Sequence, residues 1–362
     1  MTRLTAISLL FMAMFPLSLS TSRGASYIVA NLKTSDLGYS SLTGQIYAAV
    51  PDASSTNPNT LTPIDPATAT LGAAIPIGFD PARIAVSSDG ANVFTIIGGR
   101  RAVQRYRLPT ATADQLFSVA GGPVFDDMYA ILGRPNAVVL HESQPGISPP
   151  AVATVVYENG VLLPEQVGHG VGVGGPDIIA VDPADGTKAY GYQNTISSYD
   201  NVPMVIGPLG IDTTGPAPLQ GVVVGPHGPI AITGDHLFSN QGRIFSMSLG
   251  FQVASFLGGD LFTLDVEDRR LYTISSSGTT KTFRAYSLDT LALVGTDVLT
   301  GVSGNPSSLI RLDSNAMAFR TSADQVVIFR SSAVVPEPSG LVIAAVFSFA
   351  LLCVRRRGAS VG

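Results

Sequence analysis

The sequence lacks tryptophan, holds a single cysteine and carries few charged side chains. Only 13% of its 362 residues are charged, and the cations are 18 arginines and only 3 lysines. The formal net charge of -5 leaves no basic surface that could neutralise a row of phosphates, so nucleic acid is excluded as a partner. The one cysteine, Cys353, permits neither an intrachain disulfide nor a thiolate metal site.

What the sequence does contain is enough apolar material for a large core. Hydrophobic residues make up 45% of the chain, which rules out a disordered protein of this length. The 38 glycines and 25 prolines are spread along the chain rather than gathered in one segment. Both residue types punctuate turns, so their frequency favours many short strands.

The first 25 residues have the order of a secretory signal peptide. Arg3 is followed by an apolar stretch, residues 6–19, and then by small residues at positions 20, 22, 24 and 25. A cation, an apolar stretch too short to span a bilayer comfortably and a small-residue exit are typical of such peptides. We expect cleavage near residues 22 to 25 and export of the rest of the chain. A buried N-terminal helix is the alternative, which Pro16 would interrupt.

The last 28 residues combine a Pro-Glu-Pro motif, an apolar run and an arginine cluster. The motif residues are Val335, Pro336, Glu337 and Pro338, and the arginines are Arg355, Arg356 and Arg357. The fourteen residues 341–354 would form a helix of roughly 21 Å, shorter than a hydrocarbon core of about 30 Å. We therefore place a marginal transmembrane helix at 340–354. The positive-inside rule puts the basic tail 355–357 in the cytoplasm and the preceding chain outside.

This order of features resembles the PEP-CTERM sorting signal of exported bacterial proteins. The resemblance implies that an exosortase reads residues 335–362 at the inner membrane, and that the membrane-anchored precursor then reaches the cell surface or the extracellular space. An ordinary tail anchor with a proline-rich linker is the alternative, and in that case the helix stays in the membrane.

The body, residues 26–334, contains a repeated segment. An apolar residue, two further residues, a second large apolar or aromatic residue and a polar turn recur seven times, at intervals of about 44 residues. The copies are Leu61/Ile64, Val103/Tyr106, Thr154/Tyr157, Ile196/Tyr199, Ile244/Met247, Phe283/Tyr286 and Val326/Phe329. A second segment precedes each copy, beginning at Gln45, Asn92, Ala137, Lys188, His236, Arg270 and Met317. A third piece, with a proline at 81, 176 or 306, marks the expected start of the innermost strand.

Seven copies of about four short strands predict an all-β, seven-bladed propeller. Stretches such as 60–68 and 84–94 resemble the repeats of YVTN and lactonase-like propellers. The last copy, 308–332, has room for only three strands, so we expect Tyr27–Asn31 to complete the seventh blade and close the ring. A β-sandwich of irregular repeats is the alternative fold. The lack of tryptophan separates the chain from quinone-dependent dehydrogenase, sialidase and WD-repeat propellers, whose blade motifs use that residue.

Residues able to support catalysis or bind a metal are few and scattered. The four histidines, His141, His169, His227 and His236, lie in different copies without metal-ligand spacing, so we predict no metal site. The glycine-rich run 168–175 lacks the α/β unit of a dinucleotide loop, so we interpret it as a connection between blades and predict no cofactor. The acidic candidates are Asp126, Asp127, Asp177, Asp182, Asp185, Asp265, Glu267 and Asp268. Most stand where aspartate forms turns, so we assign no catalytic residue.

These observations predict an exported, non-enzymatic binding or structural protein of the cell surface or extracellular matrix, with a polysaccharide or a surface protein as its partner. The alternative is a lactonase-like hydrolase with an acidic site in the central channel. The lining of that channel distinguishes the two, since a cluster of carboxylates and histidine favours chemistry and a mixed apolar rim favours binding.

Overall fold

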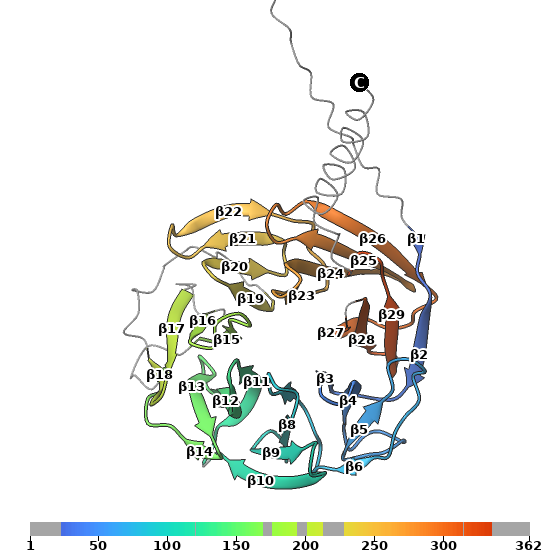
Figure 1. The fold of residues 1–362 in the computed structure, drawn as a ribbon. Coiled ribbons are helices and arrows are strands. Elements are labelled where there is room, and N and C mark those ends of the chain that lie inside the picture. The colour runs from blue at the N-terminus through green and yellow to red at the C-terminus, as the bar shows by residue number, and fades with distance from the viewer. Residues whose placement is uncertain are drawn as a thin grey trace, which may run out of the picture.

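The computed structural model describes residues 23–119, 121–168, 176–193, 201–212, 228–313 and 315–334, which form seven β-sheets arranged around a centre (Figure 1). Each sheet is one blade, and we number the blades in chain order. Blade 1 contains β3 (Asp36–Ser40), β4 (Gln45–Val50), β5 (Thr60–Ile64) and β6 (Ile75–Pro76). Blade 2 contains β7 (Ile84–Val86), β8 (Asn92–Ile97), β9 (Ala102–Arg107) and β10 (Thr112–Ser118). Blade 3 contains β11 (Val124–Ile131), β12 (Arg134–Ser143), β13 (Ala151–Glu158) and β14 (Val161–Leu162).

The remaining blades follow the same order. Blade 4 contains β15 (Ile178–Val181), β16 (Lys188–Tyr192), β17 (Asn201–Gly207) and β18 (Gly210–Asp212). Blade 5 contains β19 (Ile230–Thr233), β20 (His236–Ser239), β21 (Arg243–Ser246) and β22 (Phe251–Ser255). Blade 6 contains β23 (Leu261–Asp265), β24 (Arg270–Ser277), β25 (Thr280–Ser287), β26 (Leu293–Thr300) and the N-terminal β1 (Arg23–Gly24). Blade 7 contains β27 (Pro306–Asp313), β28 (Ala316–Thr321), β29 (Gln325–Arg330) and the N-terminal β2 (Tyr27–Asn31).

Closure of the ring by the N-terminus is confirmed. Strand β2 runs antiparallel to β29, with Tyr27 opposite Phe329 and Asn31 opposite Gln325, and it forms the outermost strand of blade 7. Strand β1 adds a short parallel pairing to β26 in the neighbouring blade. The Tyr27 hydroxyl donates a hydrogen bond to the Thr300 carbonyl oxygen at 2.9 Å, so the N-terminal segment contacts two blades.

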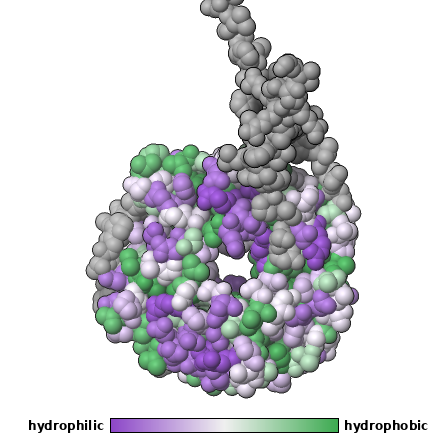
Figure 2. All heavy atoms as spheres, in the orientation of Figure 1, coloured by the Kyte–Doolittle hydropathy of each residue, from purple (hydrophilic) through white to green (hydrophobic). Residues whose placement is uncertain are grey.

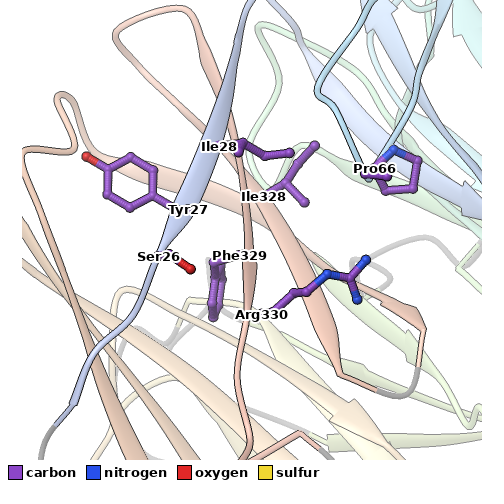
Figure 3. A pocket seen from close by; sticks show the side chains of 8 residues that line it. Ser26, Tyr27, Ile28, Pro66, Ile328, Phe329 and Arg330 are labelled. Carbon is purple, nitrogen blue, oxygen red and sulfur yellow. The ribbon is translucent and has the colours of Figure 1, made fainter.

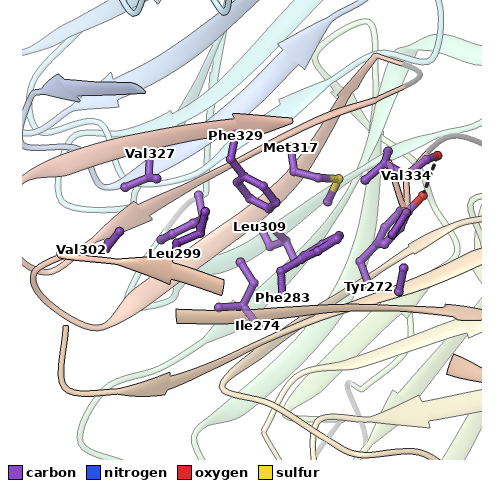
Figure 4. Packing of buried hydrophobic residues seen from close by; sticks show 13 residues of the cluster. Tyr272, Ile274, Phe283, Leu299, Val302, Leu309, Met317, Val327, Phe329 and Val334 are labelled. Atoms are coloured by element: carbon purple, nitrogen blue, oxygen red, sulfur yellow. Dashed lines mark hydrogen bonds between the residues drawn. The ribbon is translucent and has the colours of Figure 1, made fainter. Parts of the chain in front are cut away.

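The core consists of seven hydrophobic clusters, one between each pair of neighbouring blades. The alternation of strand side chains explains this arrangement. In β4, Ile46, Ala48 and Val50 pack toward blade 7, whereas Tyr47 and Ala49 pack toward blade 2. Figure 4 shows the cluster between blades 6 and 7. The Phe283 and Phe329 rings pack edge to face there, with their ring centroids 5.0 Å apart. Central strands buried on both faces therefore stabilise the ring.

The predicted repeats correspond to defined strands. The second segment falls on the second strand of every blade, and the first segment falls on the third strand of six blades. In blade 4 the predicted Ile196/Tyr199 pair lies outside the described residues, and the third strand is β17, which begins at Asn201. The prolines at 81, 176 and 306 come at or just before the first strands β7, β15 and β27, as predicted.

Both predicted targeting segments lie largely outside the described residues. These are the signal peptide, described only at its last residues, and the sorting signal with Val335, Pro336, Glu337, Pro338, the helix 340–354, Arg355, Arg356 and Arg357. Among the residues that the structure describes, none belongs to a helix long and apolar enough to cross a membrane.

Candidate functional site

The seven blades leave an opening at the centre of the disc, as Figure 2 shows. The first strands of the blades surround it, and Gly38 in β3 allows a close approach to β7. A Cβ atom at this position would lie 2.7 Å from Val86 Cγ2 and 2.8 Å from Ile84 Cγ2. Strand direction alternates within a blade, so all first strands begin on one face of the disc. We call this the entrance face, and the opposite face, with the turns between first and second strands, the turn face.

A buried polar network joins three blades at the entrance face. Asp36, at the start of β3, accepts hydrogen bonds from the Ile84 amide at 3.0 Å and from the Ser308 hydroxyl at 2.6 Å. Ser308 lies at a β-bulge with a φ of 51°, a left-handed backbone conformation that is uncommon for a side-chain-bearing residue. Arg320 in β28 donates to the Ser308 oxygen at 3.1 Å and to the Thr34 carbonyl oxygen at 3.1 Å. Blades 7, 1 and 2 are therefore held together through these side chains.

A second group, on blades 2 and 3, faces the channel. Asp127 in β11 accepts hydrogen bonds from the Tyr129 hydroxyl at 2.9 Å and from the Met128 amide at 3.0 Å. The Arg83 Nε atom, just before β7, lies 3.8 Å from Asp127 Oδ1. The Arg83 side chain is 45% exposed and that of Asp127 is 32% exposed, so solutes in the channel can reach both.

Burial and neighbouring charges shift the pKa values of all three side chains in this group. Burial raises the pKa of the Asp127 carboxyl, and Arg83 and the hydrogen bond from Tyr129 offset only part of that effect. Burial, followed by the charge of Asp127, holds the pKa of the Tyr129 phenol well above its usual value. Burial opposes the charge on Arg83, yet the carboxylates of Asp127 and Asp36 give it a raised pKa overall. Arg83 therefore lies between two carboxylates that both favour its charge.

His141 in β12 lies opposite Asp127 in the pairing of β11 with β12, and it is only 3% exposed. Its Nε2 atom has no hydrogen-bond partner in the structure. Burial lowers the pKa of the His141 ring, although the charges of Asp126, Asp127 and Asp177 act in the opposite direction.

Three of the other acidic candidates behave as predicted at turns. The side-chain oxygens of Asp182, Asp185 and Asp265 accept backbone hydrogen bonds from residues two or three positions later, at 2.8 to 3.0 Å. Asp265 and Asp268 also form ion pairs with Arg311 near the turn face. The turn interpretation is wrong for Asp126 and Asp127, which lie within strand β11.

The remaining sequence candidates are dispersed. His236 begins β20 on the turn face, while His169 and His227 lie outside the described residues. The run 168–175 falls between β14 and β15, hence between two blades, and only Gly168 of it is described. Across the described ranges, no group of three or more histidine, cysteine, aspartate or glutamate residues is placed to hold a metal ion.

Two further hollows lie on the turn face. Figure 3 shows the one beside the N-terminal strand. It is lined by Ser26, Tyr27 and Ile28, by Pro66 and by the β29 residues Ile328, Phe329 and Arg330. The other lies between blades 3 and 4 and includes the Arg134–Glu158 ion pair at 2.9 Å. Neither brings together side chains from more than two blades, whereas the entrance side chains come from five. The channel entrance is therefore the candidate site.

Sequence reasoning named Asp126, Asp127, Asp177 and His141 as candidates without placing them in one site. It missed Asp36, Arg83, Ser308 and Arg320, because the entrance residues come from separate repeats. Asp36, Arg83, Asp177 and Ser308 each lie within a few residues of the start of a first strand. A search for polar residues at this one position of every repeat would have found them. His141 and Arg320 lie near the entrance ends of second strands and carry no such signal.

Comparisons with known proteins identify the fold. No protein-family model matches the chain, and no curated protein matches it either. Hydrazine synthase of Kuenenia stuttgartiensis superposes with a TM-score of 0.60 at 12% sequence identity, covering 88% of this chain and 99% of that one. The Cps50 (Swd1) β-propeller domain of Myceliophteria thermophila gives a TM-score of 0.55 at 10% identity, covering 85% of this chain and 100% of that one. These similarities confirm the seven-bladed propeller and concern the fold alone.

Proposed function

We propose that this chain is an exported binding module of the cell surface or extracellular matrix, which binds its partner at the channel entrance. The observation that supports it most is the gathering of polar side chains from five blades around an open channel. Arg83 and Asp127 keep part of their surface exposed there. Asp36 and Ser308 instead use their hydrogen-bonding capacity to join blades, and His141 has almost no exposed surface.

The test is binding of the purified body, residues 26–334, to cells that lack their own copy of the protein. Arg83→Gln removes the exposed cation of the entrance, and Arg269→Gln, at an exposed ion pair on the turn face, is the matched control. We expect the wild type and Arg269→Gln to bind equally and Arg83→Gln to bind about tenfold more weakly, the effect of losing one central polar contact. Equal binding by Arg83→Gln would reject the entrance as the binding site.

The alternative, a lactonase-like hydrolase, is favoured by one specific observation. Asp127 lies beside Arg83 at the channel entrance, and its position in β11 is directly opposite that of His141 in β12. A hydrolase would use Asp127 as a general base toward a water in the channel. Lactone hydrolysis by the wild type, abolished in Asp127→Asn, would establish this activity, whereas equal background rates would exclude it for the lactones tried.

We further propose that export and sorting follow the two terminal segments, with an exosortase as the processing partner and a membrane-anchored precursor. The support is the order of the Pro-Glu-Pro motif, the apolar run and the arginines. Replacing Pro336, Glu337 and Pro338 together by alanine should leave an uncleaved, membrane-retained protein. Mass spectrometry of the mature wild-type protein should find no peptide that extends through Arg355, and finding one would favour the simple tail anchor.

A further inference from the structure

Strand β1 leads the N-terminus along the outer strand of blade 6 (Figure 1). It runs parallel to β26, with Arg23 opposite Asp297 and Gly24 opposite Val298. The Ala25 amide continues this pairing and donates a hydrogen bond to the Val298 carbonyl oxygen at 3.2 Å. The backbone of the N-terminal segment is therefore held beside Asp297.

Asp297 projects into the seam between blades 6 and 7. It stands opposite Phe283 in the pairing of β25 with β26, so the two side chains share one face of blade 6. Phe283 and Leu299, which lies two residues further along β26 on that face, both pack in the cluster between blades 6 and 7. On the other side of Asp297, a Cβ atom on Gly295 would lie 2.6 Å from Ala333 Cβ. The Asp297 side chain therefore points toward the N- and C-terminal segments that cover this seam.

The carboxylate of Asp297 is buried without a partner. The residue is 8% exposed, and among the described residues none offers a hydrogen bond to its buried Oδ2 atom. Lys281, on the same face of β25 as Phe283, donates instead to the Ser276 hydroxyl and to the Gly278 carbonyl oxygen. A carboxylate taken out of water needs a cation or several hydrogen-bond donors as compensation. The described part of the seam therefore lacks a cationic donor.

Removal of the signal peptide creates such a donor. A signal peptidase hydrolyses one peptide bond with water, which leaves a carboxylate on the released peptide and a new ammonium group on the body. Small residues three positions and one position before the cut, the usual preference, occur for cuts after Ser22 and after Gly24. The new ammonium group is then on Arg23, directly opposite Asp297, or on Ala25, at the end of the same pairing.

This ammonium group differs from the amide that it replaces. A peptide nitrogen has one N–H and no charge, whereas an ammonium group has three N–H donors and a positive charge. One donor can keep the backbone pairing with β26 while another reaches the carboxylate. Charge-assisted hydrogen bonds are roughly twice as strong as neutral ones. Cleavage therefore supplies a contact that the backbone of the precursor cannot make.

Resting on the proposed export, we propose that Asp297 binds the α-ammonium group of the mature N-terminus. Removal of the signal peptide thereby completes the closure of the ring at the seam between blades 6 and 7. The hydrogen bond from Tyr27 to the Thr300 carbonyl oxygen keeps the segment on blade 6, so the terminus stays within reach of Asp297. Arg23 carries the competing cation, and the test separates the two.

The test is a double-mutant cycle in thermal unfolding. Versions of the body begin at Arg23 or at Ala25, each with a free N-terminus or with a Gly-Ser-Gly-Ser extension that moves the ammonium group by up to about 14 Å. At pH 7 we expect Asp297→Asn to lower the midpoint by about 2 to 5 °C in the free chains and not to lower it in the extended chains. Asp289→Asn, at an exposed ion pair in the same blade, is the matched control and should have equal effects in both forms.

Two outcomes would overturn the proposal. One is an equal effect of Asp297→Asn in the free and extended chains at both starting points. The other is that Arg23→Ala abolishes the effect of Asp297→Asn in the free chain that begins at residue 23, which would assign the carboxylate to the Arg23 guanidinium group.

Sequencing of the exported protein separates this proposal from that of export. A mature N-terminus at residues 23–25 without coupling to Asp297 would leave export intact and reject only the ammonium contact. A mature protein that retains residues 1–22 would reject both.

Discussion

Removal of strand β2 should destabilise the whole ring, because this strand joins the N-terminus to the last blade. The test compares chains that begin at Arg23, Ser26 and Leu32. The second lacks β1, and the third lacks both β1 and β2. Strand β2 remains in the body wherever cleavage falls between residues 22 and 25. The mature protein should therefore always contain it.

The magnitude follows from the side chains that β2 buries. Ala30 is 3% exposed, and Tyr27 and Val29 pack against the cluster between blades 6 and 7. Without β2, the buried residues Val327 and Phe329 would lose part of their cover. At roughly 1 to 3 kcal/mol for each large buried side chain, the loss is about 4 to 8 kcal/mol, comparable to the whole stability of many proteins.

Thermal unfolding followed by circular dichroism measures this loss. We expect the chain that begins at Leu32 to unfold about 10 to 20 °C lower than the chain that begins at Ser26, or not to fold at all. The chain that begins at Ser26 should differ only slightly from the one that begins at Arg23, because β1 pairs through two residues. Equal midpoints for the Ser26 and Leu32 chains would refute closure of the ring by β2.

Three further variants test the packing and the electrostatics. Phe329→Ala should lower the free energy of unfolding by about 3 to 5 kcal/mol in urea, and a loss below about 1 kcal/mol would contradict the central place of its ring in the cluster between blades 6 and 7. Gly38→Ala should lower the free energy of unfolding by about 1 to 3 kcal/mol, because its Cβ atom would lie 2.7 Å from the Val86 side chain of β7. Unchanged stability would show that β3 and β7 separate easily. Burial raises the pKa of Asp127, with Arg83, Tyr129 and Asp36 as the charged and titratable groups around it, so the folded state loses stability as the pH rises from the unfolded pKa through the folded pKa. Relative to wild type, Asp127→Asn should therefore gain stability in urea as the pH rises above the unfolded pKa of about 4, and a relative loss would contradict this sign.

The sequence predicts the fold well because the second and third strands of each blade are buried on both faces. Their apolar residues recur in every copy, as in Ile46 of β4 and Phe329 of β29. The exception is blade 4, where Ile196 and Tyr199 match the pattern but the third strand begins at Asn201. A pattern of five positions places such a strand only to within a few residues.

The site was less predictable, because it depends on contacts between repeats. Asp127 looked like part of an acidic turn pair, and only the three-dimensional structure places it beside Arg83 of the preceding blade. The charges that act on the buried His141 ring include that of Asp177, which is 36 residues away in the chain and belongs to the next blade. Neither relation has a sequence spacing that a motif could record.

The most direct test of the account asks which face of the disc binds the partner. The body, residues 26–334, contains no cysteine, so single cysteines can be placed and linked to a bulky polymer. Asp260→Cys lies on the entrance face at the start of β23, and Ser41→Cys lies on the turn face after β3. We predict that the polymer at residue 260 blocks binding to cells and that the polymer at residue 41 does not. If the polymer at residue 41 blocks binding to cells and the polymer at residue 260 does not, the proposal that the channel entrance is the binding site is contradicted.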